Sequence, residues 1–143
     1  MRTYYIFFID QAFLTLYRDK PNLLYRNFYQ IYKMSHDNYG MGIKIYSQLI
    51  TPFNKKQINE YIYNKHNQEL SYTNHNYTHI INNRYTHEIT KLTVYNTYLK
   101  IITNKNDPYF FNTLYHIPYN VFICDFKNHD YFWLESIEQE ILV

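Results

Sequence analysis

The stretch that decides the fold lies near the start of the chain and reads Tyr4-Tyr5-Ile6-Phe7-Phe8-Ile9. An unbroken run of aromatic and β-branched side chains predicts a buried strand. Asp10 follows, and its carboxylate can accept hydrogen bonds from the free amide groups of a first helical turn, so a helix is expected over residues 11–17. The chain therefore begins with a core strand that leads directly into a short helix.

Helical and strand patterns follow one another up to residue 64. Apolar residues recur at spacings of three and four from Asn22 to Met34, which predicts a second helix. Gly40 and Gly42 mark a loop, and the alternation from Ile43 to Ile50 indicates a strand. Thr51-Pro52 is typical of a helix start, and this helix is expected to end near Asn64.

The second half is dominated by strand patterns. We expect a long polar excursion over 65–83 with one short strand near 78–81, a hairpin of 88–94 and 98–103, a helix from 106–108 to 116, and strands at 121–126 and 131–134. This order predicts the α/β (α+β) class, with a central mixed β-sheet of about five strands flanked by helices. The 143 residues are expected to form one domain, 1–143.

Composition excludes several classes of function. The net charge is only +2, from 14 Lys+Arg and 12 Asp+Glu, which argues against a polybasic surface for nucleic acid. With two glycines, the chain has neither a Walker loop nor a dinucleotide fingerprint. Its single cysteine, Cys124, permits no internal disulfide, and we find no export signal or membrane span. These features favour a soluble cytoplasmic protein without a cofactor.

Candidates for chemistry are weak. His75 and His79 are four residues apart, but no cysteine or carboxylate lies beside them at ligand spacing, so no metal site is expected. Cys124, Asp125 and His129 could suggest a catalytic trio, yet alternation along a strand points the first two to opposite faces. We therefore expect no catalytic residue and no enzyme.

Two binding functions remain open from the residues alone. Lysines near exposed aromatic rings would suit a nucleic-acid-binding module, for which the candidates are Lys55-Lys56 and Lys65-His66. The first helix offers another possibility, because Phe13 and Tyr17 are four residues apart and stack on one helical face. If Leu16 faces the core, Phe13 and Tyr17 cannot both lie inside as well. One side of the helix would then present aromatic rings to solvent, where they would form an interface anchor. The alternative is that both rings belong to the core.

Three passages stand out in order along the chain. They are the opening strand with Phe13-x-x-x-Tyr17 after it, the Ile50-Thr51 region where a strand runs into a proline and a helix, and Asp125-Phe126-x-x-x-x-Tyr131-x-Trp133-Leu134 behind an aromatic-rich helix at 108–116. Together these passages resemble the SirA family of sporulation inhibitors of replication, and the last one looks like the C-terminal signature of that family. The chain departs from the family in its apolar Leu14 and Leu16 and in its wealth of tyrosine and asparagine.

The resemblance implies a non-enzymatic inhibitor that binds the N-terminal domain of the replication initiator DnaA as cells enter sporulation. The family's binding helix uses a Phe and a Tyr four residues apart, which fall on Phe13 and Tyr17. By the same resemblance Trp133 fills the core and Asp125 fixes the following turn. No cofactor, metal, small-molecule substrate, membrane or direct nucleic-acid contact is implied.

Overall fold

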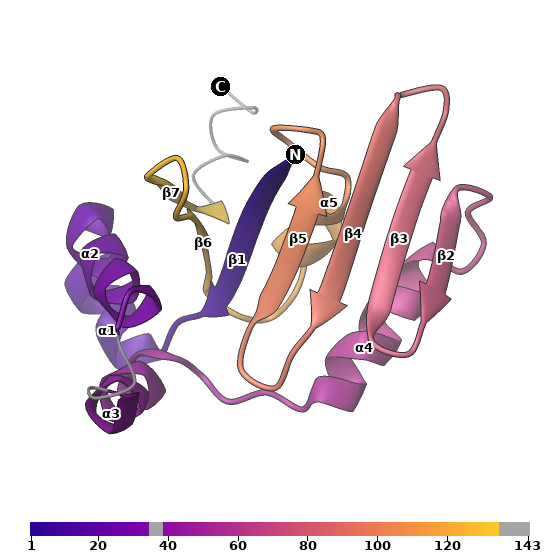
Figure 1. Ribbon diagram of the computed structural model, residues 1–143. Helices are drawn as coiled ribbons and strands as arrows, with labels where there is room; N and C mark the ends of the chain where they lie inside the picture. Colours follow the sequence, from indigo (N-terminus) through magenta and orange to yellow (C-terminus); the bar gives the residue numbers. More distant parts are fainter. Residues whose placement is uncertain (35–38, 135–143) are drawn as a thin grey trace.

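Strand β1 (Arg2–Phe8) lies inside a seven-stranded sheet of order β2-β3-β4-β5-β1-β6-β7. The computed structural model describes residues 1–34 and 39–134 (Figure 1). The other strands are β2 (Tyr72–His75), β3 (Thr78–Asn83), β4 (Glu88–Val94), β5 (Leu99–Thr103), β6 (Val121–Asp125) and β7 (Asp130–Trp133). The helices are α1 (Gln11–Tyr17), α2 (Pro21–Tyr32), α3 (Tyr39–Leu49), α4 (Lys55–His66) and α5 (Phe110–Tyr115). The predicted α+β class is confirmed.

Both faces of β1 are covered, which explains its unbroken apolar sequence. Tyr4, Ile6 and Phe8 enter a core cluster with residues of α4 and α5. Phe7 and Ile9 enter a second cluster, on the other face, with residues of α2. In Figure 1, α4 and α5 lie behind the sheet, whereas α1, α2 and α3 gather beside its β7 end. The near face of β2–β5 carries no helix of the described residues.

The sheet differs from the prediction in strand number and direction. Within the described residues it has seven strands instead of about five, and every strand pairing there is antiparallel, so the predicted mixed sheet is wrong. The sequence pattern did not predict strand β2, because only Tyr72 of its four residues is buried and the stretch around it is polar. It pairs with β3 through a tight turn in which Asn76 has a positive φ of 53°. Asparagine tolerates this left-handed conformation better than most residues.

The strand expected from Ile43 to Ile50 is instead helix α3. Ile43 and Ile45, which suggested alternation, are 48 % and 38 % exposed. The inward positions are Gly42, Tyr46, Leu49 and Ile50, which follow a helical spacing of four, seven and eight. The apolar residues at 43 and 45 therefore produced an alternation typical of a strand. The residues that are buried instead recur with the period of a helix.

Helix α4 begins later than expected. Its N-cap is Asn54, whose side chain accepts a hydrogen bond from the backbone N–H of Gln57 at 3.1 Å. Thr51 is not the cap, because α4 begins only at Lys55, and the backbone N–H of Thr51 donates to the carbonyl of Phe8 at 2.7 Å. Ile50 forms an isolated antiparallel bridge with Ile9, so the chain is held against the end of β1 before α4 starts. No helix of the described residues is long and apolar enough to cross a membrane.

The layer between α4 and the sheet contains buried histidines. His79 bonds the Tyr72 hydroxyl through Nδ1 at 2.6 Å and Asn59 Oδ1 through Nε2 at 2.7 Å. Burial, with a smaller contribution from nearby His66, lowers the pKa of His79 to about 4. In the unfolded chain this histidine becomes protonated below its ordinary pKa of 6.5. In the folded protein the imidazole of His79 stays neutral until the pH falls to about 4.

We therefore predict that the free energy of unfolding falls as the pH drops from about 6.5 to about 4. In that window the unfolded state binds more protons, so lowering the pH favours unfolding. Urea denaturation at several pH values measures the effect. His79→Gln should weaken the pH dependence in this window, whereas His75→Gln, at an exposed position of β2, should leave it unchanged. An unaltered slope in His79→Gln would contradict the assignment.

Candidate functional site

Helix α1 is fixed at its first residue by Asp10. The Asp10 carboxylate accepts a hydrogen bond from the backbone N–H of Ala12 at 2.9 Å, which confirms the predicted N-cap. The backbone N–H of Asp10 donates to the carbonyl of Leu49 at 2.9 Å, so the end of α3 holds the start of α1. The side chain of Asn120 also donates to that of Gln11, at 3.2 Å. These bonds orient α1 without burying it.

None of the seven residues of α1 is buried. Phe13, Leu14 and Tyr17 are half-buried and pack against the cluster on the α2 side of the sheet. The rings of Phe13 and Tyr17 stack, with centroids 6.2 Å apart and planes at 14°. Neither alternative from the sequence therefore holds in full, because the two rings rest on the core and keep part of their surface open to solvent.

Tyr17 is also held by a polar contact. Its hydroxyl accepts a hydrogen bond from Nδ2 of Asn27, on α2, at 3.1 Å. A partly exposed tyrosine that is fixed at its hydroxyl end loses little conformational entropy when a partner covers its ring. Helix α2 thus positions the aromatic pair of α1.

Leu16 points away from the core and is 59 % exposed. The possibility that Leu16 faces the core is therefore wrong. Residues three apart are neighbours on a helix, so Leu16 lies beside Phe13 at the exposed edge of the stacked pair, and we call Phe13, Leu16 and Tyr17 together the α1 patch. Sequence reasoning missed Leu16 as a member of this surface, although its i+3 position relative to Phe13 was a signal for it.

The catalytic trio that the sequence suggested is not assembled. Cys124 is buried, and burial raises the pKa of its thiol well above the ordinary value. Burial alone would raise the pKa of Asp125, but hydrogen bonds from Asn128 and Arg2 outweigh it and hold this pKa low. His129 bonds the hydroxyl of Tyr25 at 3.1 Å. Each of the three groups is thus committed to the structure.

The two roles implied for the C-terminal signature are both confirmed. Asp125 fixes the turn after β6 by accepting hydrogen bonds from the backbone N–H of Asn128 at 3.2 Å and from its side chain at 2.7 Å. Arg2 also donates to Asp125 at 3.0 Å, which joins the start of β1 to the end of β6. Trp133 is buried and packs edge-on against Phe122, with ring centroids 4.9 Å apart.

The histidine and lysine candidates are dispersed. His75 is exposed on β2 while His79 lies in the interior, and the described part of the chain contains no group of three or more residues suited to a metal ion. Two lysines of α4 lie over nearby tyrosine rings: the ammonium of Lys55 is 4.0 Å from the Tyr77 centroid and that of Lys65 is 5.6 Å from the Tyr61 centroid. His66, the other half of the second pair, is buried and bonded to Thr113, so it offers no surface to a nucleic acid.

Comparison with known families identifies a relationship over almost the whole chain. A family model described as sporulation inhibitor of replication protein SirA matches residues 2–138. The match spans β1, the α1 patch and the C-terminal signature. Among curated proteins, no significant match was found.

We predict that Asp10→Ala loosens α1 without unfolding the protein. Loss of an N-cap costs about 1 kcal/mol, and this cost should be confined to a helix that contributes no buried residue. Hydrogen exchange of the amides of residues 11–17 should become faster, with little change in the amides of β1. Asp19→Ala, at an exposed position beyond the helix, is the matched control. Equal acceleration throughout the sheet would show that α1 is part of the global folding unit.

Proposed function

Because the chain belongs to the family of the sporulation inhibitor of replication protein SirA, we propose that it inhibits replication by binding the N-terminal domain of the initiator DnaA through the α1 patch. In this proposal the protein acts as a cytoplasmic binding protein rather than as an enzyme. The observation that carries the proposal is the placement of Phe13 and Tyr17: they are stacked, half-exposed and held on a helix with no buried residue.

The α1 patch has the composition of an interface anchor. Aromatic residues are enriched among the side chains that dominate binding energies, and a neighbouring apolar residue extends the area that a partner can cover. Leu16 supplies that area beside the two rings, since it is 59 % exposed. The bonds from Asp10 and Asn27 keep the helix in place before a partner arrives. Less ordering is then needed on binding.

The expected binding energy is compatible with a functional inhibitor. An aromatic side chain has about 150–250 Å² to bury, and roughly half of it remains available on each half-buried ring. At about 25 cal/mol per Å², each ring can contribute about 2–3 kcal/mol before the cost of association is subtracted. Contributions of this size, with that of Leu16 added, are those of an interface anchor, and contacts outside the α1 patch supply the rest of the binding energy.

Inhibition then follows from occupation of a surface. An initiator domain that assembles through contacts with other proteins is disabled when a small, rigid protein covers those contacts. No group in the described residues has to react for this to occur, since the α1 patch binds through packing alone. The mechanism requires only that α1 stay oriented on the sheet, which the hydrogen bond between Asp10 and Leu49 provides.

We predict that Phe13→Ala and Tyr17→Ala each weaken binding to the DnaA N-terminal domain by about tenfold or more, the range of an interface anchor. The thermal unfolding midpoint should change little, because neither ring is fully buried. Calorimetric titration of each full-length variant with the isolated DnaA domain measures the affinity, and circular dichroism measures the unfolding. Collapse of the fold in both variants would show that the rings are core.

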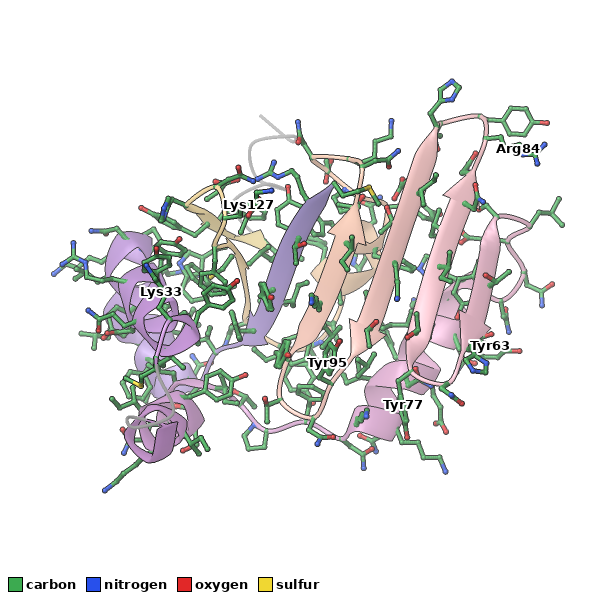
Figure 2. All side chains as sticks on the ribbon, in the orientation of Figure 1. Lys33, Tyr63, Tyr77, Arg84, Tyr95 and Lys127 are labelled. Atoms are coloured by element: carbon green, nitrogen blue, oxygen red, sulfur yellow. The ribbon has the colours of Figure 1, made fainter. Side chains whose placement is uncertain are left out.

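Leu16→Glu tests the same surface without touching a packed ring. A carboxylate at this exposed position should abolish binding by placing a charge in an apolar interface, while the fold is preserved. The matched control is Tyr63→Ala, which removes a 42 % exposed tyrosine from α4, on the other side of the molecule from α1 (Figure 2). Unchanged affinity in a folded Leu16→Glu variant would overturn the proposed binding site.

A further inference from the structure

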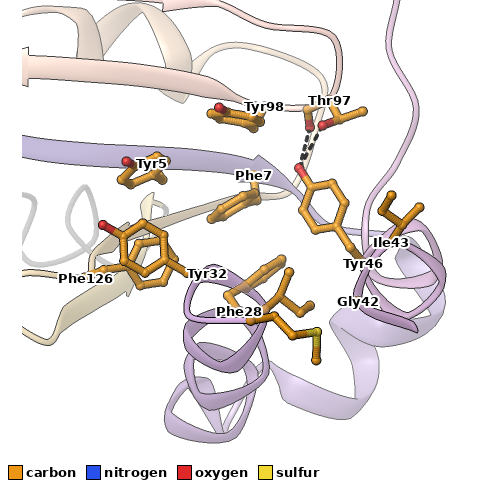
Figure 3. Close-up of a pocket in the computed structure, with 12 residues that line it drawn as sticks. Tyr5, Phe7, Phe28, Tyr32, Gly42, Ile43, Tyr46, Thr97, Tyr98 and Phe126 are labelled. Carbon is orange, nitrogen blue, oxygen red and sulfur yellow. Dashed lines mark hydrogen bonds between the residues drawn. The ribbon is translucent and has the colours of Figure 1, made fainter. Parts of the chain in front are cut away.

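A pocket of about 590 Å³ opens between the sheet and the helices α2 and α3. Figure 3 shows the rings that surround it, with Tyr5, Phe7 and Tyr98 on the sheet side, Phe28 and Tyr32 on α2, and Tyr46 on α3. Its volume lies within the range of small-molecule sites, about 300–1,000 Å³. It is distinct from the α1 patch, since none of the α1 residues lines it.

The ring arrangement suits a flat ligand. Phe7 and Phe28 stack with centroids 4.2 Å apart, and they form a rigid base for the pocket. Tyr46 stands edge-on to Phe7, at 6.0 Å and 79°, and forms an adjoining wall. Offset and edge-to-face contacts are the geometries that aromatic rings prefer, so a planar aromatic group can continue this packing inside the pocket.

Polar groups lie at one side of the pocket. The hydroxyl of Tyr46 bonds Oγ1 of Thr97 at 3.0 Å and its carbonyl at 3.2 Å, in the turn between β4 and β5 (Figure 3). A few polar groups among apolar walls are typical of sites that orient a small molecule. The hydroxyl of Thr97 can therefore offer a hydrogen bond to the edge of a heterocyclic ring.

The charge beside the pocket is positive. Of the described residues that line it, none is charged. The ammonium of Lys100 lies 5.6 Å from the ring centroid of Tyr5, one of the lining residues, and Lys100 is the strand partner of Tyr5. The outward-facing positions of β4 and β5 add Lys91 and contain no carboxylate. This side of the molecule therefore favours an anion.

We propose that this pocket binds a free mononucleotide, with its base among the aromatic rings and its phosphate toward Lys100. A nucleotide combines the two chemistries that the pocket and its edge present, a planar aromatic heterocycle and a negative charge on a short linker. An aromatic side chain of a protein would satisfy the rings alone and would bring no anion to Lys100, whose ammonium lies over the ring of Tyr5. The site is independent of the proposed binding of DnaA.

Calorimetric titration of the full chain with adenosine 5′-monophosphate tests the proposal. Adenosine and ribose 5-phosphate serve as the half-ligands. We expect the monophosphate to bind, adenosine to bind about fivefold more weakly, as for a partly exposed ion pair, and ribose 5-phosphate not to bind. Affinity for the monophosphate should fall as salt is added. No binding of the monophosphate, or equal binding of ribose 5-phosphate, would overturn the proposal. Binding of a short oligothymidylate without binding of the monophosphate would also overturn it.

Two matched pairs of variants locate the site. Ile43→Glu puts a carboxylate at the pocket wall and should abolish binding of the monophosphate, whereas Ile45→Glu makes the same change on the same helix at a position that does not line the pocket. Lys100→Gln should weaken binding about fivefold, whereas Lys91→Gln, on the adjacent strand, should have a smaller effect. All four positions are at least partly exposed, so the fold should be retained. Equal effects within both pairs would contradict the assignment.

Discussion

Burial of β1 on both faces is the constraint on which the rest of the structure depends. Tyr4, Ile6 and Phe8 supply one core and Phe7 and Ile9 the other, so a single strand joins two packed layers. The end of this strand also sets the position of α1. Ile9 bridges to Ile50, and the N–H of Asp10 bonds Leu49, so the chain leaves the sheet in a fixed direction. Changes in β1 would therefore disturb both cores and the orientation of α1 together.

The two layers use their aromatic residues differently. The face beneath α4 and α5 forms a core across six neighbouring strands, which in sheet order are β2, β3, β4, β5, β1 and β6. On the other face, α2 and α3 cover only the part of the sheet near β1, β6 and β7, and rings fill the margin of the covered part. Tyr5 and Tyr98 lie in that margin, half-buried, with centroids 5.9 Å apart. The aromatic pocket is a consequence of this incomplete covering, since rings at the margin pack on one side and remain open on the other.

Local patterns in the sequence predicted the elements whose buried side is unambiguous. The run from Tyr4 to Ile9, the hairpin of β4 and β5 and the C-terminal strands were all predicted in this way. Helix α3 was not, because Ile43 and Ile45 are apolar yet exposed, and only the packed sheet shows that Gly42, Tyr46 and Leu49 face inward. The exposure of Leu16 was not predicted, for a related reason. Which side of a two-turn helix faces solvent depends on what packs against it, and that information lies in α2 and α3 rather than in α1.

Stability and binding are separable at the α1 patch but coupled at the aromatic pocket. Helix α1 buries no residue, so its side chains can change with little effect on the core. Phe7 and Phe28, in contrast, line the pocket and are also core residues, at 5 % and 2 % exposure. A ligand there would stabilise the fold by mass action, whereas a partner on α1 would mainly order that helix.

Helix α2 joins the two surfaces, since Asn27 holds Tyr17 while the adjacent Phe28 faces the pocket. Helix α2 therefore contributes to both surfaces through adjacent residues.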